Sequence, residues 1–457
     1  MAAMTSKASD GFWAVHPHAA GIDVGHYFHW VAVPPGSAGG GPTVRRFGAF
    51  TGDLHEIARW LVQYGVTTVA LESTGVYWIA LFEVLESYGL EVCLVDTRRL
   101  KSVPGRKSDV LDCQWLQQLH PFGLLSPAFV PPPRIAVLRS YLRQRAMLVT
   151  YASHHIQHMH KALLQMNLKR GNVLSDITGQ TGLAILRAIV HGERDPQKLA
   201  AFRDPRCKQD QDTIARSLEG HWREDHLFEL RQGLELYETY RQKIQACDLE
   251  LERCLKEQPD ATPAPPPLSP AQAKRNRNAP TLDARGQLYR LCGVDLTAID
   301  GLDANTALKI VGEIGTDIRR WPTSKHFCSW LCLCPGTHKS GGRRLSSKTR
   351  RGGNLAALAL RVAAQSLERS TSAMGAFHRR MKARLGAAAA ITATAHRLAR
   401  VIYALLRYGK PYVDLGQEAY EQQFRQRMLK NLQRQARKLG LQLSDPQARP
   451  APPSPAL

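Results

Sequence analysis

The chain has 457 residues, 44% of them hydrophobic, which predicts two or three domains with buried cores. Its 61 Lys and Arg outnumber 39 Asp and Glu, and this net charge of +22 favours DNA or RNA as the partner. The absence of a signal-peptide core, of an uncharged membrane-length stretch and of a disulfide framework argues against membrane and disulfide-rich secreted proteins. We therefore expect a protein of a reducing cytoplasm.

The first 130 residues predict an α/β domain. Strands are expected at 19–25, 27–36, 43–50, 67–74 and 91–97, and helices at 51–65, 75–89 and 107–119. Thr51 is the expected N-cap of the first helix, and Gly65 its expected stop. Three strands followed by alternating strands and helices is the order of the ribonuclease H-like fold.

Four acidic residues fall where this topology brings side chains together. Asp23 and Glu72 lie near the ends of two strands, where ligand sites gather in open α/β sheets. Asp109 and Asp112 are three residues apart and share one helix face. Each acid alone is an ordinary cap, but together they predict a site for divalent cations, Mg²⁺ or Mn²⁺, at a scissile phosphodiester. Asp96 is a competing candidate that lacks a same-face acidic partner.

Residues 131–257 predict a helical coiled-coil region. Apolar residues alternate by three and four from Ile135 to Met166, and only Arg145 breaks this series of more than four heptads. A second long helix is expected from about His226 to Leu255. The two helices could pair within one chain or between chains, and a compact helical insert is expected between them.

The remaining chain divides by composition. Residues 258–283 are Pro-rich and then basic, which predicts an extended linker. Residues 284–415 predict a mostly helical domain whose first part resembles a helix-hairpin-helix, although Asp303 stands where a second glycine is usual. Residues 416–457 predict a basic tail with an amphipathic helix.

Residues 335–354, PGTHKSGGRRLSSKTRRGGN, predict a loop with the chemistry of phosphate binding. Glycines let the backbone approach a phosphate, and arginines neutralise its charge. A lone serine in a loop is ordinarily a solvated turn residue, but these cations and the upstream acids favour Ser340 as a nucleophile. Ser346 and Ser347 are alternatives with fewer flanking glycines. The residues expected to contact nucleic acid are Lys339, Gly341, Gly342, Arg343, Arg344, Lys348, Arg350 and Arg351.

Five segments carry a resemblance to a known family. They are GIDVGHYFHWVAV, ALESTGVYW, VDTRRLKSVPGRKSDVLDCQWL, DITGQTGLAILRAIVHGERDP and the serine segment above. Through them, roughly over residues 18 to 415, the chain resembles the DEDD transposases of bacterial insertion sequences, the one-ten family. The resemblance implies a RuvC-like domain, a coiled-coil region and a C-terminal transposase domain. It also implies that Asp23, Glu72, Asp109 and Asp112 form the acidic tetrad and that Ser340 is the nucleophile.

The family further implies a serine recombinase guided by a structured bridge RNA that pairs with donor and target DNA. It implies a homo-oligomer, a dimer that assembles to a tetramer on DNA, in the bacterial cytoplasm at the nucleoid. The predicted function is therefore cutting and rejoining of DNA through Ser340 with an acidic, magnesium-binding site. A metal-dependent junction nuclease, a DNA invertase of the same build and a non-catalytic nucleic-acid-binding protein remain as alternatives.

Overall fold

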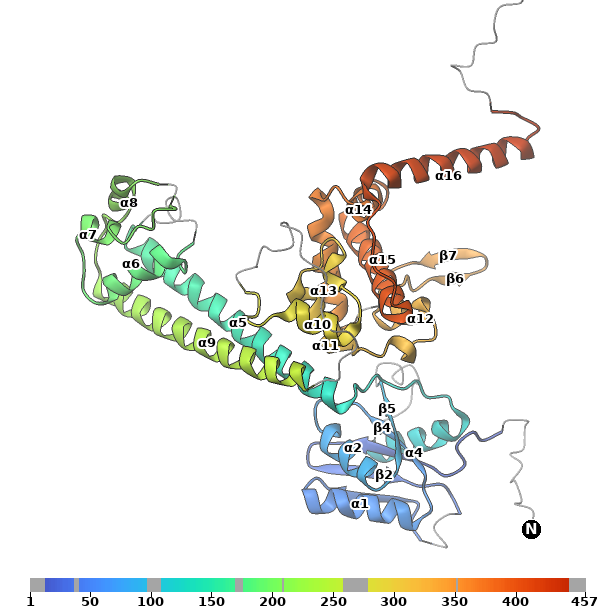
Figure 1. The fold of residues 1–457 in the computed structure, drawn as a ribbon. Coiled ribbons are helices and arrows are strands. Elements are labelled where there is room, and N and C mark those ends of the chain that lie inside the picture. The colour runs from blue at the N-terminus through green and yellow to red at the C-terminus, as the bar shows by residue number, and fades with distance from the viewer. Residues whose placement is uncertain are drawn as a thin grey trace, which may run out of the picture. The chain divides into compact units, whose positions relative to one another are not determined.

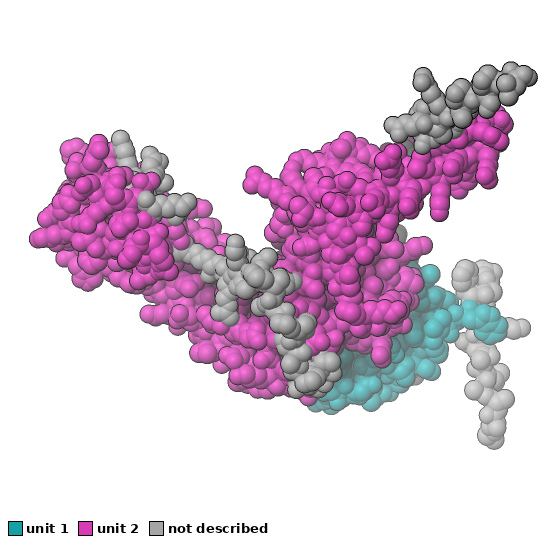
Figure 2. Space-filling view, turned by 45° about the horizontal axis from the view of Figure 1, so that its top comes forward, with its two compact units in different colours: residues 1–130 teal, residues 131–457 magenta. Residues whose placement is uncertain are grey.

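The structure is a computed structural model that describes residues 13–36, 41–96, 108–168, 176–207, 209–257, 278–350 and 352–443. Most of the predicted linker and the end of the basic tail lie outside the described residues. The chain divides into two compact units, residues 1–130 and 131–457 (Figure 2). Among the described helices, none is long and apolar enough to cross a membrane.

The first unit is built on a mixed five-stranded sheet (Figure 1). Its strands are β1 (Ala19–Val24), β2 (Phe28–Ala32), β3 (Val44–Gly48), β4 (Thr68–Glu72) and β5 (Glu91–Val95). Their order is β3-β2-β1-β4-β5, with antiparallel pairing among the first three strands in the chain and parallel pairing of β1 with β4 and of β4 with β5. The sequence predicted these strands and the ribonuclease H-like arrangement.

The period of two along each strand gives the sheet two different faces. Ala20, Ile22 and Val24 of β1 point into a core formed with helices α1 (Thr51–Gln63) and α2 (Trp78–Ser87). The opposite face is covered by α4 (Asp109–Leu119), which is followed by the 3₁₀ turn η1 (His120–Phe122). Along β1 and β4, Asp23 and Glu72 alternate with the residues that point into this core, so both carboxylates lie on the α4 side.

The start of α1 differs from the prediction by one residue. Phe50, not Thr51, is the N-cap, because its backbone N–H donates to the Asp53 carboxylate at 3.1 Å and Thr51 already belongs to the helix. The helix ends at Gln63 with Tyr64 as its C-cap, and Gly65 follows in the left-handed region at φ 70°, as expected of a stop.

Two long helices dominate the first half of the second unit (Figure 1). Helices α5 (Pro133–Gln165) and α9 (Glu224–Lys256) pack against each other within the chain, and they run antiparallel because Arg145 pairs with Asp248 while Met159 lies against Gly233. The predicted insert between them consists of short helices. These are α6 (Gln180–Val190), α7 (Pro196–Ala200) and α8 (Gln211–Ser217).

Arg145, the residue that interrupts the heptad pattern, is buried rather than turned to solvent. Its Nε donates to the Asp248 carboxylate at 2.5 Å, and one of its terminal nitrogens donates to the carbonyl of Asn278. Asp248 also accepts bonds from the backbone N–H and the hydroxyl of Thr281, at 3.0 and 3.2 Å. This buried network ties α5 and α9 to the segment that enters the C-terminal helices.

The C-terminal part is mostly helical, as predicted. Its helices are α10 (Ala284–Cys292), α11 (Ala304–Ile314), α12 (Ser324–Trp330), α13 (Leu355–Ser366), α14 (Ala373–Leu385), α15 (Ala387–Tyr408) and α16 (Gly416–Lys438). Single 3₁₀ turns are η3 (Leu296–Ala298), η4 (Ile318–Arg320) and η5 (Leu367–Arg369), and the two strands are β6 (His338–Ser340) and β7 (Arg343–Ser346).

The segment that resembles a helix-hairpin-helix departs from that motif. Its first helix is only the 3₁₀ turn η3, and Asp303 is the N-cap of α11, where its side chain accepts a bond from the Thr306 N–H at 2.7 Å. A Cβ at Gly301 would lie 2.9 Å from the carbonyl oxygen of Ala363 in α13. The glycine therefore serves close packing between elements of the protein.

Candidate active site

Asp23 and Glu72 meet at the ends of two neighbouring strands. In the parallel pair β1–β4, Ile22 lies opposite Leu71, so the next residue of each strand is an acid. Glu72 is close enough to Asp23 to act on its ionisation directly. Strand pairing alone thus brings together two of the four predicted acids.

The other two acids come from the first turn of α4. Ser108 is the N-cap of this helix, with its hydroxyl accepting from the Leu111 N–H, and Asp109 and Asp112 follow directly. The positive end of the helix macrodipole partly offsets their charge. Asp109 is exposed and Asp112 is half-buried. Both act electrostatically on Asp23, so all four predicted acids belong to one neighbourhood.

The environment of Asp23 changes its ionisation. Burial, a hydrogen bond that protonated Asp23 donates to Glu72, and repulsion by Glu72, Asp109 and Asp112 raise the pKa of Asp23 from 3.8 to about 7. Asp96, the competing candidate, is not among the groups that raise this pKa. Such mutual repulsion among carboxylates is relieved when a cation joins them.

The donor set of this cluster suits a hard divalent cation, because carboxylate oxygens are the ligands that Mg²⁺ prefers. Within the described ranges, no three His, Cys, Asp or Glu side chains come close enough together to hold one ion. The acids therefore fit a metal ion in ligand type and charge. Their side chains would have to turn further inward to ligate it.

The sequence did not predict two features of this region. Gly21 on β1 lets α4 approach the sheet closely, since a Cβ there would lie 2.4 Å from the Cys113 carbonyl oxygen. An aromatic cluster lies on the loops that follow β1 and β4 and consists of His26, Tyr27 and Tyr77. The centre of the His26 ring is 4.3 Å from that of Tyr27 and 4.9 Å from that of Tyr77. The signal for the cluster was present in GHYF and TGVYW, directly after the strands that carry Asp23 and Glu72.

Ser340 lies in the second unit, in a β-hairpin, where the sequence predicted a Gly- and Arg-rich loop. It ends β6 and pairs with Arg343 of β7, across a two-residue turn formed by Gly341 and Gly342. Both glycines have positive φ, 54° and 76°, which a tight hairpin turn requires and which other residues rarely adopt. The turn exposes Ser340 at the end of the hairpin.

The neighbouring serines differ in their contacts. The Ser346 hydroxyl accepts a bond from the Lys348 N–H at 3.3 Å, so it stabilises the end of the hairpin. Ser347 is exposed. Among the described contacts, the Ser340 hydroxyl has no hydrogen-bond partner that could act as a general base.

The predicted cationic residues are mostly at the surface of this hairpin. Lys339, Arg343 and Lys348 are exposed, and Arg350 donates to the Ser329 hydroxyl at 2.8 Å. Arg344 contributes its backbone to β7, whereas Arg351 lies outside the described residues. The hairpin therefore carries an exposed serine among exposed cationic side chains, and such cations are suited to contact phosphate groups.

An acidic cluster at the strand ends of this sheet, covered by the helix that supplies two of the acids, defines a DEDD-type nucleic-acid enzyme of the ribonuclease H-like class. Residues 20–168 match the family model of DEDD transposases of the IS110 type. Residues 295–379 match the model described as Transposase IS116/IS110/IS902 family. No curated protein sequence matches the chain.

The chain belongs to the IS110 family of transposases, enzymes that cut and transfer DNA strands. Membership implies DNA substrates and dependence on a divalent metal ion. The first matched segment contains the four acids, and the second contains the hairpin with Ser340.

Proposed function

We propose that this chain is a recombinase that cuts and rejoins DNA through a covalent bond to Ser340. The observation that carries the proposal is the convergence of Asp23, Glu72, Asp109 and Asp112 from three separate elements of a DNA transposase. These four carboxylates would hold divalent cations, which when bound lower the pKa of an attacking hydroxyl and neutralise charge on a phosphate.

In the proposed step, the Ser340 hydroxyl gives up its proton and its oxygen forms a bond to phosphorus, while the bond from phosphorus to one strand oxygen breaks. The leaving oxygen takes up a proton and becomes a free hydroxyl end. Attack by a hydroxyl end on the phosphoserine then reverses the exchange and restores the serine, so no external energy source is needed. Lys339 and Arg343 flank Ser340 and would hold the phosphate in place.

Trapping the covalent intermediate tests this chemistry. The wild-type chain, incubated with end-labelled DNA and Mg²⁺ and then denatured, should retain label, and mass spectrometry should locate the remnant on Ser340. Ser340→Ala should bind DNA without forming an adduct, whereas Ser347→Ala, which changes an exposed serine directly after the hairpin, should form it normally. Cleavage by Ser340→Ala without any adduct would instead support a metal-dependent nuclease.

Asp109→Asn tests the acidic cluster separately. An amide is a poor ligand for a hard cation, and Asp109 is exposed, so its loss should leave the fold intact. We expect DNA binding to persist and strand cleavage to be lost. A variant that cleaves at the wild-type rate would remove Asp109 from the proposed site.

We further propose that a structured bridge RNA selects donor and target DNA and that the enzyme acts as a homo-oligomer. The net charge of +22 supports a large polyanionic partner, and exposed Leu164, Phe228 and Leu249 on the long helix pair support contacts with other copies. Recombination by the purified chain should require added RNA transcribed from the flanking non-coding DNA. Light scattering on the protein–DNA complex should give the mass of a tetramer. Recombination without added RNA would refute the guide role of the RNA. A complex with the mass of one protein chain would refute the homo-oligomer.

A further inference from the structure

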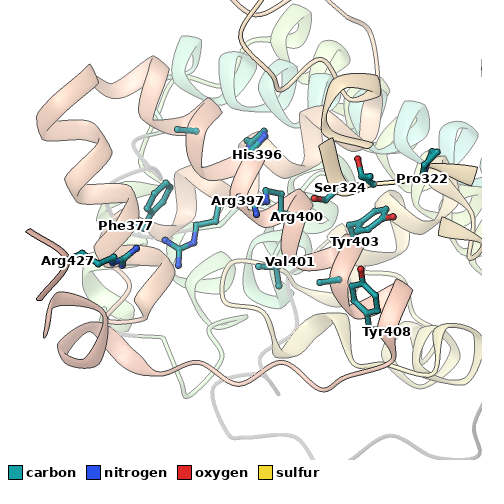
Figure 3. A pocket seen from close by; sticks show the side chains of 13 residues that line it. Pro322, Ser324, Phe377, His396, Arg397, Arg400, Val401, Tyr403, Tyr408 and Arg427 are labelled. Carbon is teal, nitrogen blue, oxygen red and sulfur yellow. The ribbon is translucent and has the colours of Figure 1, made fainter. Parts of the chain in front are cut away.

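The second unit contains a cleft that is separate from the hairpin. It has a volume of about 750 Å³ and is lined by α15, with residues from α14, α16 and the start of α12 (Figure 3). On α15, the lining residues His396, Arg400, Ala404 and Tyr408 follow one another at intervals of four, which places their side chains on one helix face. One side of α15 is thus a wall of this cleft.

The charge of the cleft has one sign. Arg397, Arg400 and Arg427 line it, and no Asp or Glu is among the lining residues. In the described part of the chain, none of the three arginines forms an ion pair with a carboxylate. Three guanidinium groups without internal neutralisation attract an anion, and their planar donor sets match phosphate oxygens.

Aromatic rings accompany these charges. Phe377 lies at the end of the cleft where Arg427 is found, and Tyr408, 66% exposed, lies toward the other end (Figure 3). The guanidinium carbon of Arg397 is 4.6 Å from the centre of the Phe377 ring. Rings beside guanidinium groups are the surfaces on which unpaired bases stack, because every base has a π face.

We propose that this cleft binds an unpaired nucleotide of a single-stranded nucleic acid. Arg400 and Arg427 contact phosphate, and the base stacks against an aromatic ring of the cleft. A duplex cannot use the site in this way, because its bases are already stacked and paired. Most of the lining residues lie on α15 and α16, beyond the matched segment that ends at residue 379. The site does not depend on the proposed serine chemistry, since binding is measured without cleavage.

The test compares two double variants of the full chain in EDTA, so that no metal-dependent cleavage occurs. Arg400→Gln with Arg427→Gln removes two exposed cleft arginines, and Arg407→Gln with Arg434→Gln removes two exposed arginines outside it on the same two helices. The probes are fluorescein-labelled oligo(U) RNA and oligo(dT) DNA of about 12 nucleotides and a DNA duplex. Fluorescence anisotropy gives each Kd over a series of salt concentrations.

We expect the cleft variant to bind single strands at least about tenfold more weakly. The slope of log affinity against log salt concentration should become shallower by about 0.7 for each phosphate contact that is lost. The control variant and the duplex should change by less than about twofold, the scatter expected for surface charges. If the cleft variant loses more affinity for oligo(U) than for oligo(dT), the site binds RNA, and the reverse result assigns it to DNA. Equal losses of affinity mean that the site accepts both.

Tyr408→Ala gives an independent measurement, because this exposed ring can be removed without loss of the fold. It should weaken single-strand binding about tenfold with an unchanged salt slope. The proposal is overturned if the cleft variant binds single strands as the wild type does. It is also overturned if the cleft and control variants lose the same affinity, or if duplex binding weakens equally, since the arginines would then act only through overall charge.

Discussion

Gly21→Ala is the most direct test of how the fold positions the acidic cluster. Gly21 lies in the middle of β1, two residues before Asp23 and under α4. A methyl group there would lie 2.3 Å from the Gln117 nitrogen and 2.4 Å from the Cys113 carbonyl oxygen. Both are backbone atoms of α4, so no side-chain rotation can relieve the overlap.

The size of the effect follows from these distances. To restore an ordinary separation of about 3.5 Å, α4 must retreat by roughly 1 Å. That movement carries Asp109 and Asp112 away from Asp23, and a displacement of about 1 Å at a catalytic site can lower the rate by about 10²-fold. Overpacking of a core costs about 1–3 kcal/mol, so the domain should still fold.

The assay is strand cleavage of labelled DNA in Mg²⁺, together with thermal unfolding. Gly52→Ala is the matched control, because a Cβ at Gly52, in the first turn of α1, meets nothing within 4 Å. We expect cleavage to fall about a hundredfold in Gly21→Ala and to remain normal in Gly52→Ala. A wild-type rate in Gly21→Ala would show that the close approach of α4 does not set the positions of the acids.

Two further predictions concern ionised groups. Because burial and Glu72 raise the pKa of Asp23 from 3.8 to about 7, the folded state holds a proton that the unfolded chain has lost. The free energy of unfolding of the metal-free protein should therefore fall as pH rises from about 4 to about 7. Asp23→Asn should flatten this pH dependence in urea unfolding. Identical pH profiles of the variant and the wild type would refute the prediction. Asp248→Asn should lower stability by about 3–5 kcal/mol because it leaves Arg145 buried without its charged partner. Removing Glu257, the partner of Arg253 in an exposed ion pair, should lower stability far less in the same measurement, and equal losses would contradict the role of burial.

The sequence by itself determined the helices and strands and the face of the sheet on which each strand side chain lies. Alternation along β1 and β4 already places Asp23 and Glu72 on one face, because side chains in a strand repeat every two residues. Amphipathic spacing located α5 and α9 to within a few residues for a similar local reason. The hairpin at Ser340 was missed although its Gly-Gly pair is a turn signal, because its polar strands lack an apolar alternation.

The tertiary structure decided what local periodicity cannot encode. It showed that α4 covers the face of the two strand acids and that Gly21 allows its close approach. It gave Arg145 a buried partner more than a hundred residues away, where the heptad pattern showed only an interruption. It also assembled the arginine cleft from several helices. Each of these features joins residues that are distant in the chain, and their contacts arise only when the elements pack.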